Sequence, residues 1–192
     1  LTAADARAVL AAFAAAEAAG IASWALRTAA EYSKVRVQFG RPIGAFQAIK
    51  QIVADMLCRA EQSAALAWDA ARSVGAGTEH HLAAAVAAAG ALDAAVQNAK
   101  DAIQVLGGIG FTFEHDAHLY LRRATALRLL LGDTPGWRTR AAELAICAAR
   151  YFGEYGIMDS PLRLAHLLAQ LIHESGSFLY MEEIASGQGY EG

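Results

Sequence analysis

Cysteine, proline and strand-like alternation are all scarce in this sequence. It has only 2 cysteines and 3 prolines in 192 residues. Cys58 and Cys147 lie far apart, which argues against a disulfide framework or a cysteine-based zinc site and favours a reducing, cytoplasmic setting. An excess of basic residues is also missing, because the sequence has 16 lysines and arginines and 19 aspartates and glutamates. The sequence therefore lacks the charge expected of a protein that binds nucleic acid.

Alanine-rich segments make up most of the chain. Hydrophobic residues account for 56% of the sequence, but many are alanine, the best helix former, so an all-α fold is predicted. The run from Ala8 to Leu26 is apolar enough to consider as a membrane span, yet its alanine content and Glu17 favour a buried bundle helix. The sequence begins at Leu1 without a methionine or a basic leader, which indicates a piece of a longer protein.

Glycine and proline divide the chain into five predicted helices. The first three are long and joined by short turns, which predicts an antiparallel up-down bundle. Thr78 is expected to cap the third helix, and GDTPG is expected to form the turn before the fifth. The segment after Tyr155 restarts at DSP and predicts a short extra helical tail. The predicted helices span about 3–35, 45–74, 79–106, 115–130 and 137–155.

Two turns carry residues suited to an anionic ligand. In RVQFGRPIG, Arg36 and Arg41 flank a rigid break, and the planar guanidinium suits bidentate phosphate binding. In QVLGGIGF, glycines at 107, 108 and 110 would allow a ligand to approach the backbone. Neither turn fits a phosphate loop or a dinucleotide fingerprint. Each alone favours a structural role, because glycines end helices and arginines complement a helix dipole.

Together, RVQFGRPIGAFQAIK and the later AIQVLGGIGF resemble the C-terminal helical domain of the acyl-CoA dehydrogenases. The resemblance covers about residues 1–145 and includes YLRRATALRLLLGDTPGWR. It implies an α-bundle that packs in a tetramer and completes an FAD site shared with a neighbouring subunit. The positions that it assigns to FAD are Arg36, Gln38 and Phe39 on the pyrophosphate side, Gln104, Gly107 and Gly108 across the subunit boundary, and, with less weight, Gln47.

The resemblance also implies that the chain lacks a catalytic base of its own. In that family a glutamate removes the α-proton of the acyl-CoA thioester while the flavin accepts hydride. Leu131 stands at one common position of this base and Leu10 near the other, and leucine cannot accept a proton. Asp133 and Glu17 are nearby carboxylates with less support. The chain would then be a base-deficient subunit or fragment that assembles, as a homo- or hetero-oligomer, with a base-bearing dehydrogenase subunit, as in the two-gene heterotetramers of bacterial steroid side-chain enzymes. The full enzyme would act on acyl-CoA with other domains that this chain lacks.

Residues 150–192 resemble a different family. LAQLIHESGSF is similar to the start of the catalytic domain of family-nineteen glycoside hydrolases, the chitinases and phage-type endolysins. This resemblance implies an inverting pair with Glu174 as the acid and Glu183 as the base. Glu182 and Glu191 are weaker alternatives for the base, and the two pieces would join within residues 141–151.

The sequence leaves three interpretations open. The first is the FAD-dependent dehydrogenase subunit or fragment, and the second is an incomplete glycan hydrolase. The third is a helical assembly module without a catalytic role. A metal site is not expected, because the pairs His80-His81 and His115-x-x-His118 lack a third ligand in view.

Overall fold

The computed structural model describes residues 2–76, 78–132 and 134–154, with side chains described up to residue 146 apart from that of Thr78. Of the predicted hydrolase segment, 150–192, the structure describes only the backbone of residues 150–154, which belong to a helix that begins at Thr134. Asp133, Glu174, Glu182, Glu183 and Glu191 lie outside the described residues. The elements in chain order are α1 Ala3–Val35, β1 Val37–Gln38, β2 Arg41–Pro42, η1 Ile43–Ala45, α2 Gln47–Arg72, α3 Thr78–Leu106, η2 Gly107–Phe111, α4 Ala117–Leu131 and α5 Thr134–Glu154.

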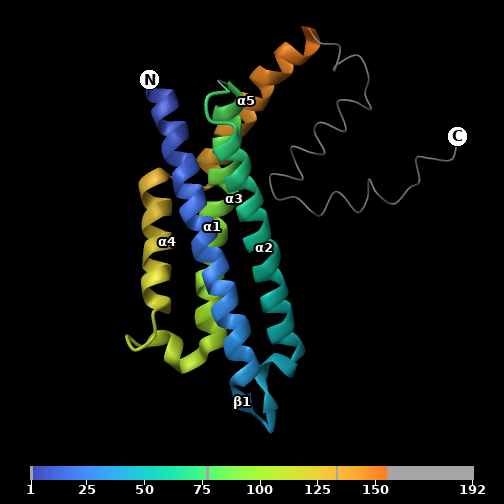
Figure 1. Ribbon diagram of the computed structural model, residues 1–192, viewed down its shortest axis with the longest axis vertical. Coiled ribbons are helices and arrows are strands. Elements are labelled where there is room, and N and C mark those ends of the chain that lie inside the picture. Colours follow the sequence, from blue (N-terminus) through green and yellow to red (C-terminus); the bar gives the residue numbers. More distant parts are fainter. Residues whose placement is uncertain (1, 77, 133, 155–192) are drawn as a thin grey trace, which may run out of the picture.

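The described part of the chain is a helical bundle, which confirms the predicted all-α class. Successive helices from α1 to α4 run in opposite directions, as Figure 1 shows. Helix α3 is central and contacts α1, α2, α4 and α5. Helix α5 packs on α3 and then runs past the end of the bundle (Figure 1). The two special turns of the sequence lie together at the opposite end.

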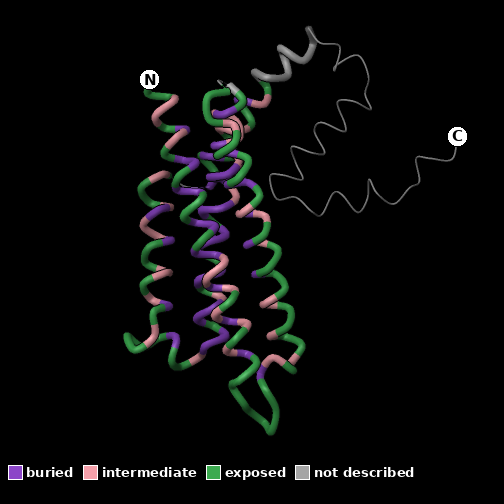
Figure 2. Tube along the Cα trace, in the orientation of Figure 1, coloured by how far each residue is buried: buried purple, intermediate pink, exposed green. Residues whose placement is uncertain are grey.

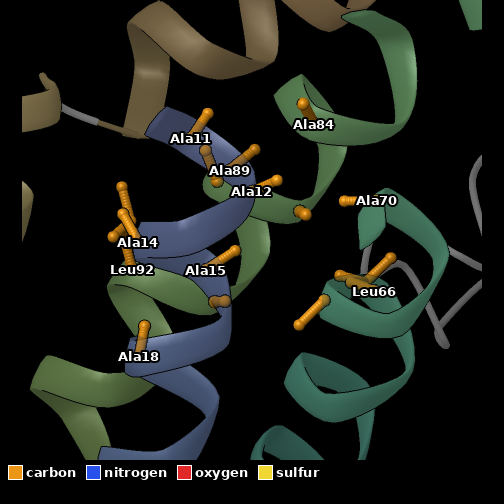
Figure 3. Close-up of a cluster of buried hydrophobic side chains, with 14 of the residues drawn as sticks. Ala11, Ala12, Ala14, Ala15, Ala18, Leu66, Ala70, Ala84, Ala89 and Leu92 are labelled. Carbon is orange, nitrogen blue, oxygen red and sulfur yellow. The ribbon is translucent and has the colours of Figure 1, made fainter. Parts of the chain in front are cut away.

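Alanine forms most of the core. The buried positions of α1 are alanines except for Ile21 and Ser33, and Figure 2 shows the buried stretches of α1 and α3 facing each other. Figure 3 shows short side chains of α1, α2 and α3 meeting in one cluster, with Leu66 and Leu92 among the larger ones. Small side chains let helix axes approach closely, so dispersion contacts between backbones add to the limited apolar area that each alanine buries.

The start of α1 carries a complete capping box. The backbone N–H of Asp5 donates to the Thr2 hydroxyl (3.1 Å), and the backbone N–H of Thr2 donates to the Asp5 carboxylate (2.7 Å). These two bonds satisfy donors that the first helical turn otherwise leaves without a partner. The same carboxylate lies 2.9 Å from Nε2 of His81 at the start of α3, which ties the ends of two helices together.

The observed helix ends differ from the predicted ones by a few residues. Helix α3 begins at Thr78 itself, and α5 begins at Thr134 rather than near residue 137. Pro135 then occupies the first turn of α5, where its missing N–H costs no helical hydrogen bond. A two-stranded antiparallel hairpin, β1 with β2, was not expected in an all-α chain.

Two helices, Ala3–Val35 and Glu79–Phe111, are long and apolar enough to pass a length and composition test for membrane spans. Their most apolar stretches are 50% and 67% buried inside the bundle. The core helices of soluble proteins pass the same test, so the result is weak evidence for a membrane. The burial agrees with the interpretation of Ala8–Leu26 as a bundle helix.

Candidate functional site

The cationic turn is a β-hairpin with a strained two-residue loop. Gln38 pairs with Arg41, and Phe39 and Gly40 form the loop between them with φ angles of 51° and 75°. Positive φ at both central positions is the pattern of a type I′ turn, whose twist matches the flanking strands. Glycine accepts this conformation readily, but phenylalanine does so at a cost of roughly 1–2 kcal/mol. Phe39 is also 90% exposed, so its own burial does not offset that cost.

The three cations of this stretch have different surroundings. Lys34 donates to Glu31 at 2.6 Å on the exposed face of α1. The Arg41 guanidinium lies over the Phe46 ring, 4.2 Å from its centroid. Among the described residues, the Arg36 guanidinium has neither an ion-pair partner nor a hydrogen-bond acceptor. Arg41 has no ion-pair partner among the described residues either, so Arg36 is distinguished by the absence of any contact of its guanidinium within the described part of the chain and is open to an external anion.

The glycine turn at the end of α3 leaves part of its backbone open. Gly107 has φ of 65°, which favours glycine, and a Cβ built on Gly107 or Gly108 would meet nothing within 4 Å. Gly110 is different, because its Cβ would lie 2.9 Å from the Ile103 carbonyl oxygen. The predicted backbone approach of a ligand therefore fits Gly107 and Gly108, whereas Gly110 is needed for packing.

Both turns line one surface pocket of about 500 Å³, which we name the two-turn pocket. Its volume lies within the range of roughly 300–1,000 Å³ that is usual for small-molecule sites. Six of the seven positions that the sequence assigned to FAD lie in its wall, so α1 and α3 bring together residues that are far apart in the chain. The lining residues are Tyr32, Arg36, Gln38, Phe39, Ile43, Phe46, Ile49, Gln104, Val105, Leu106, Gly107, Gly108 and Ile109.

Gln47, the seventh position, is not part of this wall. It is the exposed first residue of α2, and the structure does not bring it into the pocket. A second hollow of about 600 Å³ lies at the other end of α1, between Arg7 and Glu143, and shares no residue with the two-turn pocket. Within the described residues, no group of three or more histidine, cysteine or acidic side chains could hold a metal ion.

The positions discussed for a catalytic base carry no free carboxylate in the described part of the chain. Leu131 ends α4, and its carbonyl oxygen accepts a hydrogen bond of 3.0 Å from Trp137 Nε1. Leu10 is an exposed apolar residue of α1. Glu17 is paired with Arg123 through two hydrogen bonds of 2.5 and 2.8 Å. The hydrogen bond from Arg123 lowers the pKa of Glu17, which makes this carboxylate a weaker base than a free one.

Sequence reasoning missed the apolar part of the pocket. Ile43, Phe46 and Ile49 line it. Ile43 belongs to the small core cluster that includes Ala25 and Met56, and Phe46 and Ile49 pack against that cluster. The signal was present in the sequence, because Phe46 directly precedes α2 and Ile49 lies in its first turn. Only the position of the hairpin makes these residues part of the pocket wall.

The sequence of this chain matches a known protein family. The profile of the acyl-CoA dehydrogenase C-terminal domain matches residues 7–144. Acyl-CoA dehydrogenase FadE34 of Mycobacterium tuberculosis is 57% identical over 138 residues, which are 71% of this chain and 19% of that protein.

Two solved structures have a fold similar to that of this chain. Butyryl-CoA dehydrogenase from Megasphaera elsdenii is 33% identical with a TM-score of 0.66, and the match covers 71% of this chain and 36% of that one. The ChsE4-ChsE5 complex from Mycobacterium tuberculosis is 28% identical with a TM-score of 0.68, covering 71% and 37%. The chain therefore spans about a fifth of FadE34 and little more than a third of the two structures. The family match ends at residue 144, and the glycoside hydrolase interpretation of residues 150–192 has no support from these similarities.

Proposed function

The chain belongs to the acyl-CoA dehydrogenase family as a C-terminal helical domain, and from this premise we propose that the two-turn pocket binds the diphosphate-bearing part of FAD. Members of this family are FAD flavoproteins. The observation that carries the proposal is the convergence of Arg36, Gln104 and the open backbone of Gly107 and Gly108 on one pocket.

The residues of the pocket fit such a cofactor. Arg36 brings a guanidinium that has no acceptor among the described residues, and charge-assisted hydrogen bonds to phosphate are roughly twice as strong as neutral ones. Gln38 and Gln104 add amide donors and acceptors. A Cβ on Gly107 or Gly108 would project into open space, so only glycine leaves this backbone bare for a ligand. Ile43 and Phe46 supply an apolar floor on which an aromatic base can rest.

This domain would bind and orient the cofactor and would leave the chemistry to other parts of the enzyme. Bound FAD accepts the hydride when the acyl-CoA thioester is desaturated. Arg36, Gln38 and Gln104 would hold the nucleotide, and Phe39 at the hairpin tip would contact it or the neighbouring subunit. Exposed pocket residues such as Phe39 and Gly108 leave room for a second polypeptide to complete the site.

We also infer that the domain is base-deficient. Leu131 and Leu10 cannot accept a proton, and Glu17 is held by Arg123. A partner subunit or another part of a longer protein would then supply the base for the α-proton. An assembly of two kinds of subunit is supported by the similarity to the ChsE4-ChsE5 complex, and FadE34 is long enough to contain further domains.

Replacement of Arg36 tests the cofactor assignment. In the full chain, purified in the oligomer that it forms, Arg36→Ala should weaken FAD binding roughly 10- to 100-fold, because a hydrogen bond to a charged group contributes about 1.5–3 kcal/mol. Lys34→Ala is the matched control. It removes the same charge at a position two residues before Arg36, from a side chain that is already paired with Glu31. Affinity is measured by titrating apoprotein with FAD and following flavin fluorescence.

Equal FAD affinity in the two variants would contradict the assignment. An oligomer that never takes up FAD would instead support the helical assembly module.

A further inference from the structure

Phe46 is held between two side chains of the hairpin. The Arg41 guanidinium lies over one face of its ring, with Cζ 4.2 Å from the centroid. The Phe39 ring meets it edge-on, with centroids 6.2 Å apart and an interplanar angle of 86°. Phe46 is half-buried and packs on the core cluster that contains Ile43 and Met56. It therefore connects the exposed hairpin tip to the bundle.

The hairpin needs such a connection. Its strands are two residues each, and an isolated two-stranded hairpin is marginal in water. Its loop holds Phe39 in a left-handed conformation, which persists only where the surroundings enforce it. Among the described contacts, the hydrogen bond from the Ile43 N–H to the Arg36 carbonyl oxygen (2.8 Å) closes the base of the hairpin. Among the contacts of the described residues, those of Phe46 with Arg41 and Phe39 link the tip of the hairpin to the start of α2.

We propose that Arg41 is a positioning residue of the nucleotide site. By stacking on Phe46, Arg41 holds the hairpin in the orientation that keeps Arg36, Gln38 and Phe39 in the wall of the two-turn pocket. Arg41 itself is not among the lining residues, whereas Arg36 is. The two arginines of this turn thus have different tasks, since one binds the anion and the other acts through Phe46. The inference rests on the proposed function.

A through-space effect is the competing explanation for any loss of affinity at Arg41. Removing a cation near an anionic ligand weakens binding without changing the hairpin. The two explanations differ in their dependence on Phe46. A through-space effect persists when the Phe46 ring is absent, whereas a positioning effect disappears with it.

FAD titration of the full chain in its oligomer separates these explanations. Arg41→Gln should weaken FAD binding about two- to fivefold, the value of an exposed cation–π contact. Phe46→Leu should weaken FAD binding at least as much. The double variant with Arg41→Gln and Phe46→Leu should bind FAD as tightly as Phe46→Leu alone. Phe46→Tyr retains the ring, so it serves as the comparison for the amide exchange measurement, which does not depend on the pocket wall. Lys50→Gln, which removes a cation at the start of α2, is the charge control and should have little effect.

Amide hydrogen exchange without FAD gives a second readout that does not depend on the cofactor. The Ile43 amide should exchange faster in Arg41→Gln and Phe46→Leu, and should be unchanged in Phe46→Tyr and Lys50→Gln. Amides in the middle of α2, such as that of Met56, should keep their rates in all four, which shows that the bundle is intact.

Unchanged Ile43 exchange in Arg41→Gln would overturn the positioning role. An equal effect of Arg41→Gln on FAD binding with and without the Phe46 ring would also overturn it. If Arg36→Ala weakens FAD binding and Arg41→Gln does not, the positioning role fails and the pocket assignment stands. If Arg36→Ala has no effect, the proposed function fails, and the positioning role for FAD is overturned with it.

Discussion

Asn98 joins three helices through its side-chain amide, and its replacement by alanine is expected to destabilise the protein strongly. The side chain is fully buried on α3. Its Nδ2 donates to the carbonyl oxygens of Ala22 in α1 (3.1 Å) and Met56 in α2 (2.9 Å), and its Oδ1 accepts from Arg59 Nε (2.7 Å). Alanine side chains are small and nonpolar, so a core built from them does not fix how the helices are aligned along their axes. The directional hydrogen bonds of Asn98 fix this alignment.

The size of the effect follows from these contacts. Asn98→Ala removes three hydrogen bonds, each with a net contribution of about 0.5–1.5 kcal/mol. The Ala22 and Met56 carbonyls lie inside helices and keep their helical partners, and Arg59 keeps its contact with Asp101, so the lower half of that range applies. The small cavity that remains adds to the loss, and the total is about 2–4 kcal/mol. At roughly 2–4 °C per kcal/mol for a chain of this size, a loss of 3 kcal/mol lowers Tm by about 6–12 °C.

Thermal and urea denaturation followed by circular dichroism measure this loss. Gln97→Ala is the matched control, because Gln97 is the exposed neighbour with a single 3.3 Å hydrogen bond to Asp101, and it should change stability by less than about 0.5 kcal/mol. Asn98→Asp should be at least as damaging as Asn98→Ala, since a carboxylate would face two carbonyl oxygens without a proton to donate. If Asn98→Ala and Gln97→Ala unfold at the same urea concentration, the amide does not hold the helices together and the reasoning is refuted.

Two further predictions concern the hairpin and the start of α1. Phe39→Asn should stabilise the chain by about 0.5–1 kcal/mol, because asparagine tolerates a left-handed φ. The same change should weaken FAD binding, because the aromatic side chain at the hairpin tip is lost. Lower stability together with unchanged FAD affinity would contradict this prediction. At the other end, hydrogen bonds from the Thr2 backbone N–H and side chain, followed by one from His81, lower the pKa of Asp5 to about 2. This depressed pKa means that the carboxylate stabilises the fold above pH ~4 and that the contribution is lost as the pH falls through about 2. The Tm difference between the unchanged chain and Asp5→Asn should therefore shrink as the pH is lowered from 5 to 2, and a constant difference would count against the capping role of the charge.

Much of the fold could be predicted because its determinants are local. Alanine-rich segments between glycine and proline breaks predicted the helices, and short connections predicted their antiparallel order. The ends were less certain, since Thr134 and Pro135 were read as a turn and belong to α5. The hairpin escaped prediction because Phe39-Gly40 is not one of the usual type I′ pairs, and its backbone strain is visible only in the folded chain.

The candidate site could be predicted in part. Arginines and glycines stand out in an alanine-rich sequence, and six of the seven proposed FAD positions line one pocket. Gln47 shows the limit of this reasoning, because a position next to the motif need not face the same side. Glu17 shows another, since its partner Arg123 is 106 residues away and no local pattern indicates the pair. The hydrolase assignment of Glu174 and Glu183 lies outside the described residues and stays a prediction without support.

The sequence by itself determined that the chain is a helical bundle, where its two unusual turns fall, and that the expected base positions carry leucine. These features depend on residue type and short-range spacing, which a linear sequence states directly. The tertiary structure alone decided that both turns meet in one pocket and that Asn98 of α3 joins its helix to α1 and α2. It also decided that Arg41 stacks on Phe46 while Arg36 has no ion-pair partner among the described residues. Each of these depends on side chains brought together by packing between distant segments, and such contacts arise only when the helices have assembled.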